Sequence, residues 1–167
     1  MKKTLLSIFV FLLPLLVSAQ TIKFGFFSYD AALKSMPEYI IANKNLGDLK
    51  ARYDAEAKRT EDDFNRKYED FLEGQKDFPQ TILQKRQKEL EDLMDKNITF
   101  KEESQKLLSA AEHDAFAPLQ DKLNAAVKAI GKERGYAFII NTDNNSCPYM
   151  DNTLGEDIND VVKDRLK

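Results

Sequence analysis

The 167-residue sequence predicts an α+β fold that is predominantly α, with a long antiparallel helical hairpin attached to a small β-containing body. Two observations support this prediction. The highly charged stretch 37–134 carries apolar residues three and four positions apart, which is the spacing of a coiled-coil seam. Segments 22–29 and 136–141, at either end of it, are rich in the aromatic and β-branched residues that favour strands. The length is suited to one domain.

The first 19 residues have the pattern of a cleavable signal peptide. Two lysines precede an apolar run over residues 5–17, and Val17-Ser18-Ala19 offers a small-x-small cleavage site. The run is shorter than the roughly 20 residues that a membrane-spanning helix needs. We therefore expect an exported chain that begins at Gln20 and has no stable membrane anchor.

Residues 20–36 and 118–167 are expected to form the body. Alternating apolar residues give the first strand one apolar face, and the second strand follows Gly135, a typical helix terminator. Residues 147–150 are expected to be a short extended piece, and Asp157 can cap a final helix. Such a body is too small to bury an adequate core alone. We therefore expect copies of the chain to associate through five candidate interface residues: Ile22, Phe24, Phe26, Phe138 and Ile140.

The hairpin arm is expected over residues 37–117. Pro37 suits the first position of a helix, and a heptad series follows, made of Ala57, Phe64, Phe71 and Phe78. The tip is expected near residues 74–80, because Gly74 can end one helix and Pro79 can begin the next.

After the tip, the apolar pattern resumes. Leu83 and Leu90 are seven residues apart, as are Leu93, Phe100 and Leu107. Pro118 is expected to bend the second helix where it leaves the arm. At ~1.5 Å per residue, the arm would be roughly 60 Å long.

Composition excludes several classes of function. One cysteine and one histidine cannot form a disulfide framework or the usual zinc site. Without residues 1–19 the chain has 23 basic and 28 acidic side chains, a balance that argues against nucleic-acid binding. No Gly-rich phosphate loop, nucleophile elbow or metal-ligand spacing occurs in the sequence. We expect no catalytic, cofactor-binding or metal-binding residues, and no enzymatic activity.

Several isolated residues have two interpretations. His113 is expected to be a solvated residue of a charged helix, and Asp143-Asn144-Asn145 a turn in place of a calcium loop. Cys147 is expected to be a small, partly buried residue, with an intersubunit disulfide as the alternative.

The chain resembles the Skp/OmpH family of periplasmic chaperones over essentially its whole length after residue 19. The residues that carry the resemblance are the opening strand 22–28, Met36-Pro37-Glu38-Tyr39, the charged hairpin, the helix-to-strand junction 129–140, and the closing residues Tyr149, Asp157-Ile158-Asn159 and Val162.

The resemblance implies a homotrimer in the periplasm, in which three arms hang from a shared β body. It further implies an ATP-independent holdase that keeps unfolded outer-membrane proteins in the cavity between the arms and prevents their aggregation. Stretch 43–135 has 18 basic and 20 acidic residues. We therefore do not expect lipopolysaccharide binding, because a net negative arm does not attract an anionic lipid. The alternative function is that of an exported coiled-coil scaffold that binds a folded envelope partner.

The aromatic residues of the arm could act in either of two ways. The candidate client contacts are Phe64, Tyr68, Phe71, Phe78 and Leu83. On the heptad stripe, Phe64 and Phe71 would instead hold the two helices together. Phe78, beside the tip proline, is either a first contact for unfolded chains or a hydrophobic cap that closes the hairpin.

Overall fold

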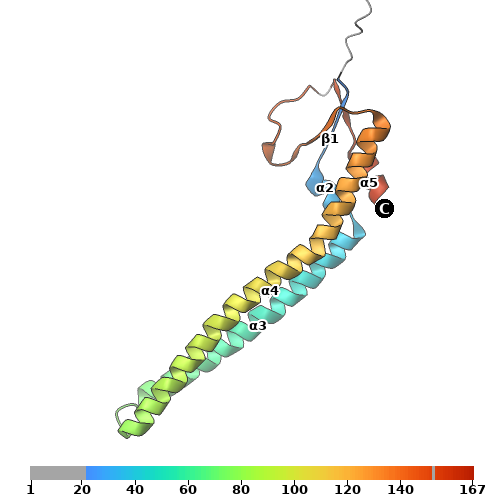
Figure 1. Cartoon of the computed structure of the whole chain (residues 1–167). Coiled ribbons are helices and arrows are strands. Elements are labelled where there is room, and N and C mark those ends of the chain that lie inside the picture. Colours follow the sequence, from blue (N-terminus) through green and yellow to red (C-terminus); the bar gives the residue numbers. More distant parts are fainter. Residues whose placement is uncertain (1–21, 152) are drawn as a thin grey trace, which may run out of the picture.

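A computed structural model describes residues 22–151 and 153–167, and the expected signal peptide lies outside these residues. A long arm of two antiparallel helices extends from a small body that contains a three-stranded sheet (Figure 1). The predicted α+β, mainly helical fold class is confirmed. In chain order the elements are β1 (Phe24–Phe27), α2 (Tyr29–Lys34), α3 (Pro37–Gly74), α4 (Gln80–Arg134), β2 (Phe138–Asn141), the 3-10 helix η2 (Asp143–Asn145), β3 (Gly155–Asp157) and α5 (Asn159–Leu166).

The second arm helix does not end at Pro118. Helix α4 runs for 55 residues with Pro118 inside it, and it changes direction where it leaves the arm for the body (Figure 1). A proline removes one backbone hydrogen bond, but burial of Leu119, Leu123 and Ile130 beyond it keeps the helix intact. The helix ends at Gly135, which adopts the left-handed conformation with φ +67°.

The two arm helices meet along a narrow, partly polar seam. The rings of Tyr53 and Phe100 lie 6.1 Å apart across it, and the Asn97 side-chain amide donates to the Thr60 carbonyl at 3.2 Å. Helix α3 has no fully buried residue over its 38 residues. The seam therefore holds the helices in register but provides little core.

One seam residue was predicted wrongly. Leu107 is 54% exposed, and its neighbour Leu108 is half-buried instead. Between residues 97 and 115 the covered positions follow steps of three, four and four residues. A straight helix drifts by about 20° per heptad, so a strict seven-residue count that starts at Leu93 is still in the seam at Phe100 but has left it at Leu107, about four turns from its start.

The sheet is assembled around β1. Its strand order is β2-β1-β3, and both pairings are parallel, with Phe24 opposite Phe138 on one side and opposite Gly155 on the other. The third strand is β3, not the expected extended piece at 147–150. Its residues, Gly155-Glu156-Asp157, lack the alternation of apolar residues that marks a strand.

The core lies between the sheet and the helices of the body. The fully buried side chains include Met36, Leu123, Ile130, Ile158, Val162 and Leu166. Gly25 allows close packing on this side, because a Cβ there would lie 3.0 Å from the Tyr136 ring and 3.3 Å from Ile158. The helix-facing side of the sheet is thus closely covered.

Polar side chains join the short helices to the strand ends. The Ser28 hydroxyl caps α2 by accepting the Ala31 N–H at 3.0 Å. Asp157 lies two residues before the first residue of α5, and its carboxylate accepts the Asn159 N–H at 2.9 Å. The side chain of Asn159 in turn accepts the Ser28 N–H at 2.9 Å, which links the two helix starts.

Asp143 completes this network from the loop after β2. Its carboxylate accepts the Asp30 N–H at 2.8 Å and the Ser28 hydroxyl at 2.6 Å. These hydrogen bonds hold the pKa of Asp143 below its ordinary value of 3.8, and the bond from the Asp30 N–H has the largest effect. The predicted Asp-Asn-Asn turn therefore fastens the start of α2 to the sheet.

We expect Asp143→Asn to lower the free energy of unfolding by about 1 kcal/mol at neutral pH, because a neutral amide is a weaker acceptor for both donors. The pKa of Asp143 is lower in the folded protein than in the unfolded chain, so the ionised carboxylate stabilises the fold at pH values above its pKa in the unfolded chain. This stabilisation is lost as the pH falls through its pKa in the folded protein. The difference between wild type and variant should therefore shrink below pH 3.8. Urea denaturation at fixed protein concentration measures it, with Asp164→Asn as the exposed control. A difference independent of pH would contradict the role of the ionised carboxylate.

Candidate functional site

One face of the sheet is not covered by the helices of its own chain. Gly25 faces Tyr136 and Ile158, and Ile139 faces Gly131 of α4, so these strand residues mark the helix side. Successive residues of a strand point to opposite faces. The residues that alternate with them therefore lie on the other face, and they are four of the predicted interface residues: Phe24, Phe26, Phe138 and Ile140.

The structure brings these four residues together. Phe24 and Phe138 are register partners and their rings stack at 5.4 Å, while Phe26 pairs with Ile140 in the next alternate row. Phe24 also packs against Gly155 of β3, where a Cβ would collide with its ring. Phe138 is nevertheless 49% exposed. Ile22, the fifth predicted residue, precedes β1 and is exposed.

An uncovered parallel sheet is unusual. Parallel sheets occur almost entirely with both faces covered. On this face Phe24 is only 9% exposed, but Phe138 beside it is 49% exposed, and contact of that apolar ring with water is unfavourable. The geometry of this face therefore matches a surface that is buried in an assembly.

The candidate contacts on the arm fall into two groups. Phe64 is half-buried and stacks on Tyr68 with ring centroids 6.0 Å apart, whereas Tyr68 itself is exposed. Leu83 is half-buried. Phe64 and Leu83 are thus largely occupied within the hairpin, and Tyr68 remains available on its surface.

Phe78 folds back onto the hairpin tip. Its ring lies 6.5 Å from that of Phe71 and packs so closely over Gly74 that a Cβ there would collide with it. Of the two interpretations of Phe78, the geometry matches the hydrophobic cap. The absence of a side chain at Gly74 therefore leaves the space that the ring occupies.

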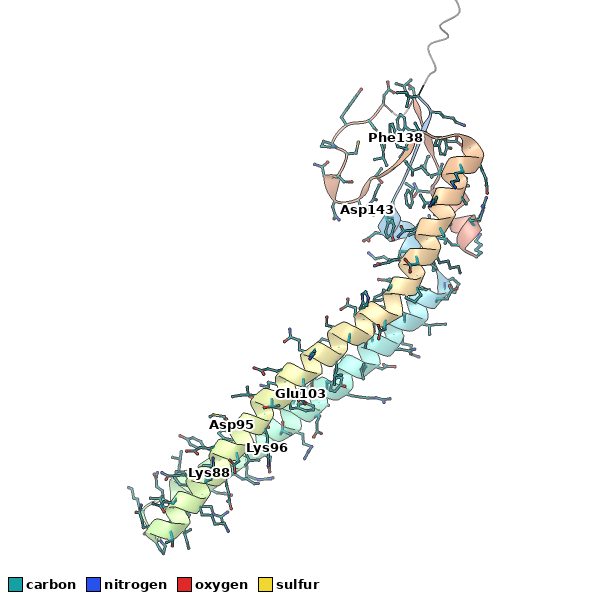
Figure 2. All side chains as sticks on the ribbon, in the orientation of Figure 1. Lys88, Asp95, Lys96, Glu103, Phe138 and Asp143 are labelled. Atoms are coloured by element: carbon teal, nitrogen blue, oxygen red, sulfur yellow. The ribbon has the colours of Figure 1, made fainter. Side chains whose placement is uncertain are left out.

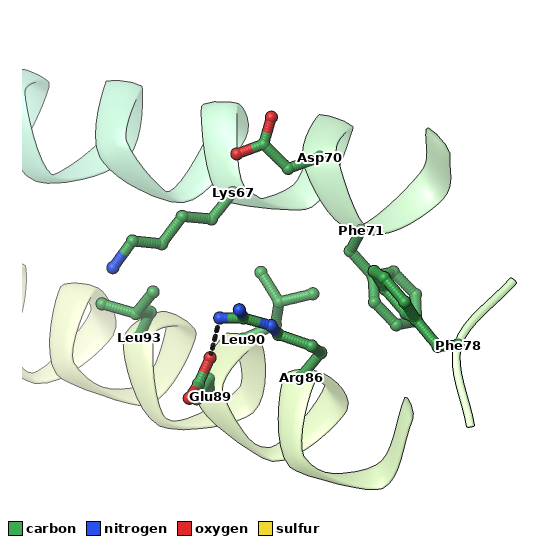
Figure 3. A pocket seen from close by; sticks show the side chains of 8 residues that line it. All are labelled: Lys67, Asp70, Phe71, Phe78, Arg86, Glu89, Leu90 and Leu93. Carbon is green, nitrogen blue, oxygen red and sulfur yellow. Dashed lines mark hydrogen bonds and ion pairs between the residues drawn. The ribbon is translucent and has the colours of Figure 1, made fainter. Parts of the chain in front are cut away.

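A cavity of about 250 Å³ lies beside this cap (Figure 3). Apolar side chains form its floor, and the long side chains of Lys67 and Arg86 reach over it from the two helices. Arg86 bonds to Glu89 at 2.8 Å and Lys67 pairs with Asp63 at 3.4 Å. Both cations are therefore balanced by carboxylates of their own helix. The lining residues are Lys67, Asp70, Phe71, Phe78, Arg86, Glu89, Leu90 and Leu93.

Many charges of the arm are paired along a single helix, and most of them face solvent. Lys88, labelled in Figure 2, pairs with Asp92 at 3.1 Å, while Asp95, Lys96 and Glu103, also labelled there, are exposed. The ion pair between Arg59 and Glu56, at 2.6 Å, is typical, and the hydrogen bond from Arg59 lowers the pKa of Glu56 below 4.5. Such exposed pairs contribute little to stability.

Sequence reasoning missed several exposed apolar residues of the arm, among them Leu72, Met94 and Ile98. They lie outside the heptad seam, and an apolar residue in such a position is the sequence signal that predicts an exposed side chain. An apolar residue off the seam of a two-helix arm has no neighbour within the hairpin to cover it.

Within residues 22–151 and 153–167, no helix is long and apolar enough to cross a membrane. Over the same ranges, no group of three histidine, cysteine, aspartate or glutamate side chains is arranged to hold a metal ion. His113 is exposed on α4, and Cys147 is a half-buried free thiol.

We expect Phe78→Ser to lower the melting temperature and helical content of the arm, because it removes the ring that covers Phe71 and Gly74. The loss should be about 1 kcal/mol for a half-buried ring. Far-UV circular dichroism during heating measures it, with Ile82→Ser, an exposed residue near the same tip, as the control. An unchanged melting curve together with weaker suppression of client aggregation would assign Phe78 to client contact instead.

Comparison with known proteins places the chain in a family. No curated protein matched the sequence. A family model described as "Outer membrane protein (OmpH-like)" matches residues 23–166, which covers β1 through α5. The match includes both the arm and the body, and the chain therefore belongs to the OmpH-like family.

Proposed function

We propose that this protein is an ATP-independent periplasmic holdase, which binds unfolded outer-membrane proteins between helical arms and prevents their aggregation. Membership of the OmpH-like family supports, at the family level, a periplasmic chaperone of outer-membrane proteins and not an enzyme. The holdase mechanism is inferred from the shape of this chain.

The observation that carries the proposal is the arm. Helix α3 alone spans 38 residues, or about 57 Å, and the hairpin exposes apolar side chains such as Tyr68, Met94 and Ile98 along its length. A surface of scattered apolar groups suits many weak contacts with an unfolded chain better than one tight contact with a small ligand.

We further propose that the body, residues 20–36 and 118–167, forms a homotrimer through the uncovered sheet face. The stacked Phe24 and Phe138, with Phe26 and Ile140 beside them, supply the apolar surface. Three arms (residues 37–117) fixed to one body would raise the effective concentration of weak contact sites around a client. Trimer formation and client binding are thereby parts of one mechanism.

Lipopolysaccharide is not part of this proposal. Stretch 43–135, which contains the arm, has 18 basic and 20 acidic residues. Long-range attraction of an anionic lipid by such a surface is weak at physiological salt.

We expect Phe138→Asp to convert the trimer to a monomer while the helical content stays near that of wild type. The reason is that Phe138 lies on the open face, where a carboxylate buried in an interface would be costly. Sedimentation equilibrium measures the mass, and Ile82→Asp at the far end of the arm is the control. A monomeric wild-type protein would defeat the assembly proposal.

We expect the purified protein to suppress aggregation of an unfolded outer-membrane barrel at about one trimer per client, with or without ATP, as binding in one shared cavity requires. Light scattering after dilution of the barrel from urea measures it. Failure to suppress, combined with saturable binding to a folded envelope protein, would instead support the scaffold function.

A further inference from the structure

Four exposed apolar residues of the distal arm lie on one side of the hairpin. Tyr68 and Leu72 are four residues apart on α3, and Met94 and Ile98 are four apart on α4, so each pair shares one helix face. Across the seam, Glu61 and Lys101 form an ion pair at 3.3 Å. Since Glu61 lies two turns from Tyr68 and Lys101 lies one turn from Ile98, this ion pair joins the two faces. We name Tyr68, Leu72, Met94 and Ile98 the distal apolar stripe.

The distal apolar stripe projects into solvent. Its four side chains are between 44% and 49% exposed. On the opposite side of the arm, the apolar groups line hollows between the helices: the tip cavity, and a groove near the body that includes Leu46, Leu49 and Ala111. Only the stripe side therefore presents a row of protruding apolar side chains in the distal arm.

The dimensions of the stripe fit an extended chain. The hydrogen bond from Asn97 to Thr60 shows which parts of the two helices lie side by side. Met94 and Ile98 lie beside the first half of segment 57–72 of α3, and Leu72 is at its other end. The stripe therefore spans about 22 Å along the arm. An extended strand rises ~3.3 Å per residue, and about seven residues would cover that length. Alternate side chains of such a segment would face the stripe.

Charge on the surrounding surface selects among such segments. Residues 61–96, the distal part of the arm, carry 11 acidic and 7 basic side chains. The charged residues three or four positions from a stripe residue, which share its helix face, are Glu69, Glu91, Asp95 and Glu102, against Lys76 and Lys101, and Lys101 is paired with Glu61. An apolar row with acidic edges is complementary to an apolar segment that carries cations.

We propose that the distal apolar stripe is a docking surface for extended, unfolded segments in which apolar side chains alternate with lysine or arginine. The proposal rests on the proposed holdase function and names the class of client sequence that the arm prefers. Apolar contact holds the segment, while the acidic edges favour cationic over anionic segments.

The test uses the purified full protein and dye-labelled peptides of about seven residues. Valine and leucine alternate with lysine in one peptide, with glutamate in the second and with serine in the third. Fluorescence anisotropy should give roughly fivefold tighter binding of the lysine peptide than of the glutamate peptide at low salt. The ratio should fall as salt is added, because exposed charges are screened. Equal or tighter binding of the glutamate peptide would overturn the proposal.

Matched variants locate the surface. The double variant Leu72→Ser with Ile98→Ser should weaken binding of all three peptides, and Glu69→Gln with Asp95→Asn should remove only the preference for lysine. Leu107→Ser is the control, because Leu107 is equally exposed but nine residues from Ile98, on the opposite side of α4. Weakening by Leu107→Ser and not by the stripe variant would overturn the location. Helical content measured in parallel confirms that each variant is folded.

The outcome separates this proposal from the holdase function. Suppression of barrel aggregation without any peptide preference would reject the docking surface alone. Preferential binding of the lysine peptide without suppression of aggregation would reject the holdase function and leave the docking surface supported.

Discussion

Two antiparallel helices touch along a single line, so each leaves most of its circumference in water. This constraint explains the composition of the arm, in which charged residues cover most of the surface outside a thin seam. It explains why α3 has no fully buried residue and why the seam accepts Asn97 bonded to a backbone carbonyl. It also means that any apolar residue off the seam remains exposed, as Met94 and Ile98 do.

Because the arm provides little core, the body has to hold the chain together. It does so around β1, whose helix side is packed against Ile158 and Tyr136 and whose other side carries Phe24 and Phe26. The core is small, and one face of the sheet is not covered by helices, so that Phe138 remains 49% exposed on it. The thin arm and the open sheet face are thus two results of one distribution of apolar residues. If several bodies associated, the open face of the sheet would be covered and several thin arms would lie side by side.

The hairpin could be predicted from sequence because its signals are local. Heptad spacing, Gly74 and Pro79 identify the helices and the tip without any knowledge of distant contacts. The body was harder to predict. Helix α2 has six residues, too few for a readable period, and β3 has no apolar alternation, so both exist only because β1 and the polar network hold them. The five candidate interface residues were predicted from strand alternation, but the side of the sheet on which four of them lie followed only from the contacts of Gly25 and Ile139. Leu72, Met94 and Ile98 were missed because they belong neither to the aromatic series nor to the seam.

The order of the strands has a consequence for how the chain folds. The carbonyl of Phe27 bonds to Thr142, 115 residues away, and Ser28 bonds to Asn159, 131 residues away. Closing loops of that size from an unfolded chain costs entropy and slows folding. The arm lies inside both loops, and its contacts form progressively outward from a tip of a few residues. Once the hairpin has formed, Tyr39 and Phe116 are neighbours, with ring centroids 5.0 Å apart, and the chain between β1 and its partners is effectively much shorter. The arm thus shortens the search for the sheet, and because β2 and β3 follow the arm in the sequence, a chain that folds from its N-terminus would complete its body last.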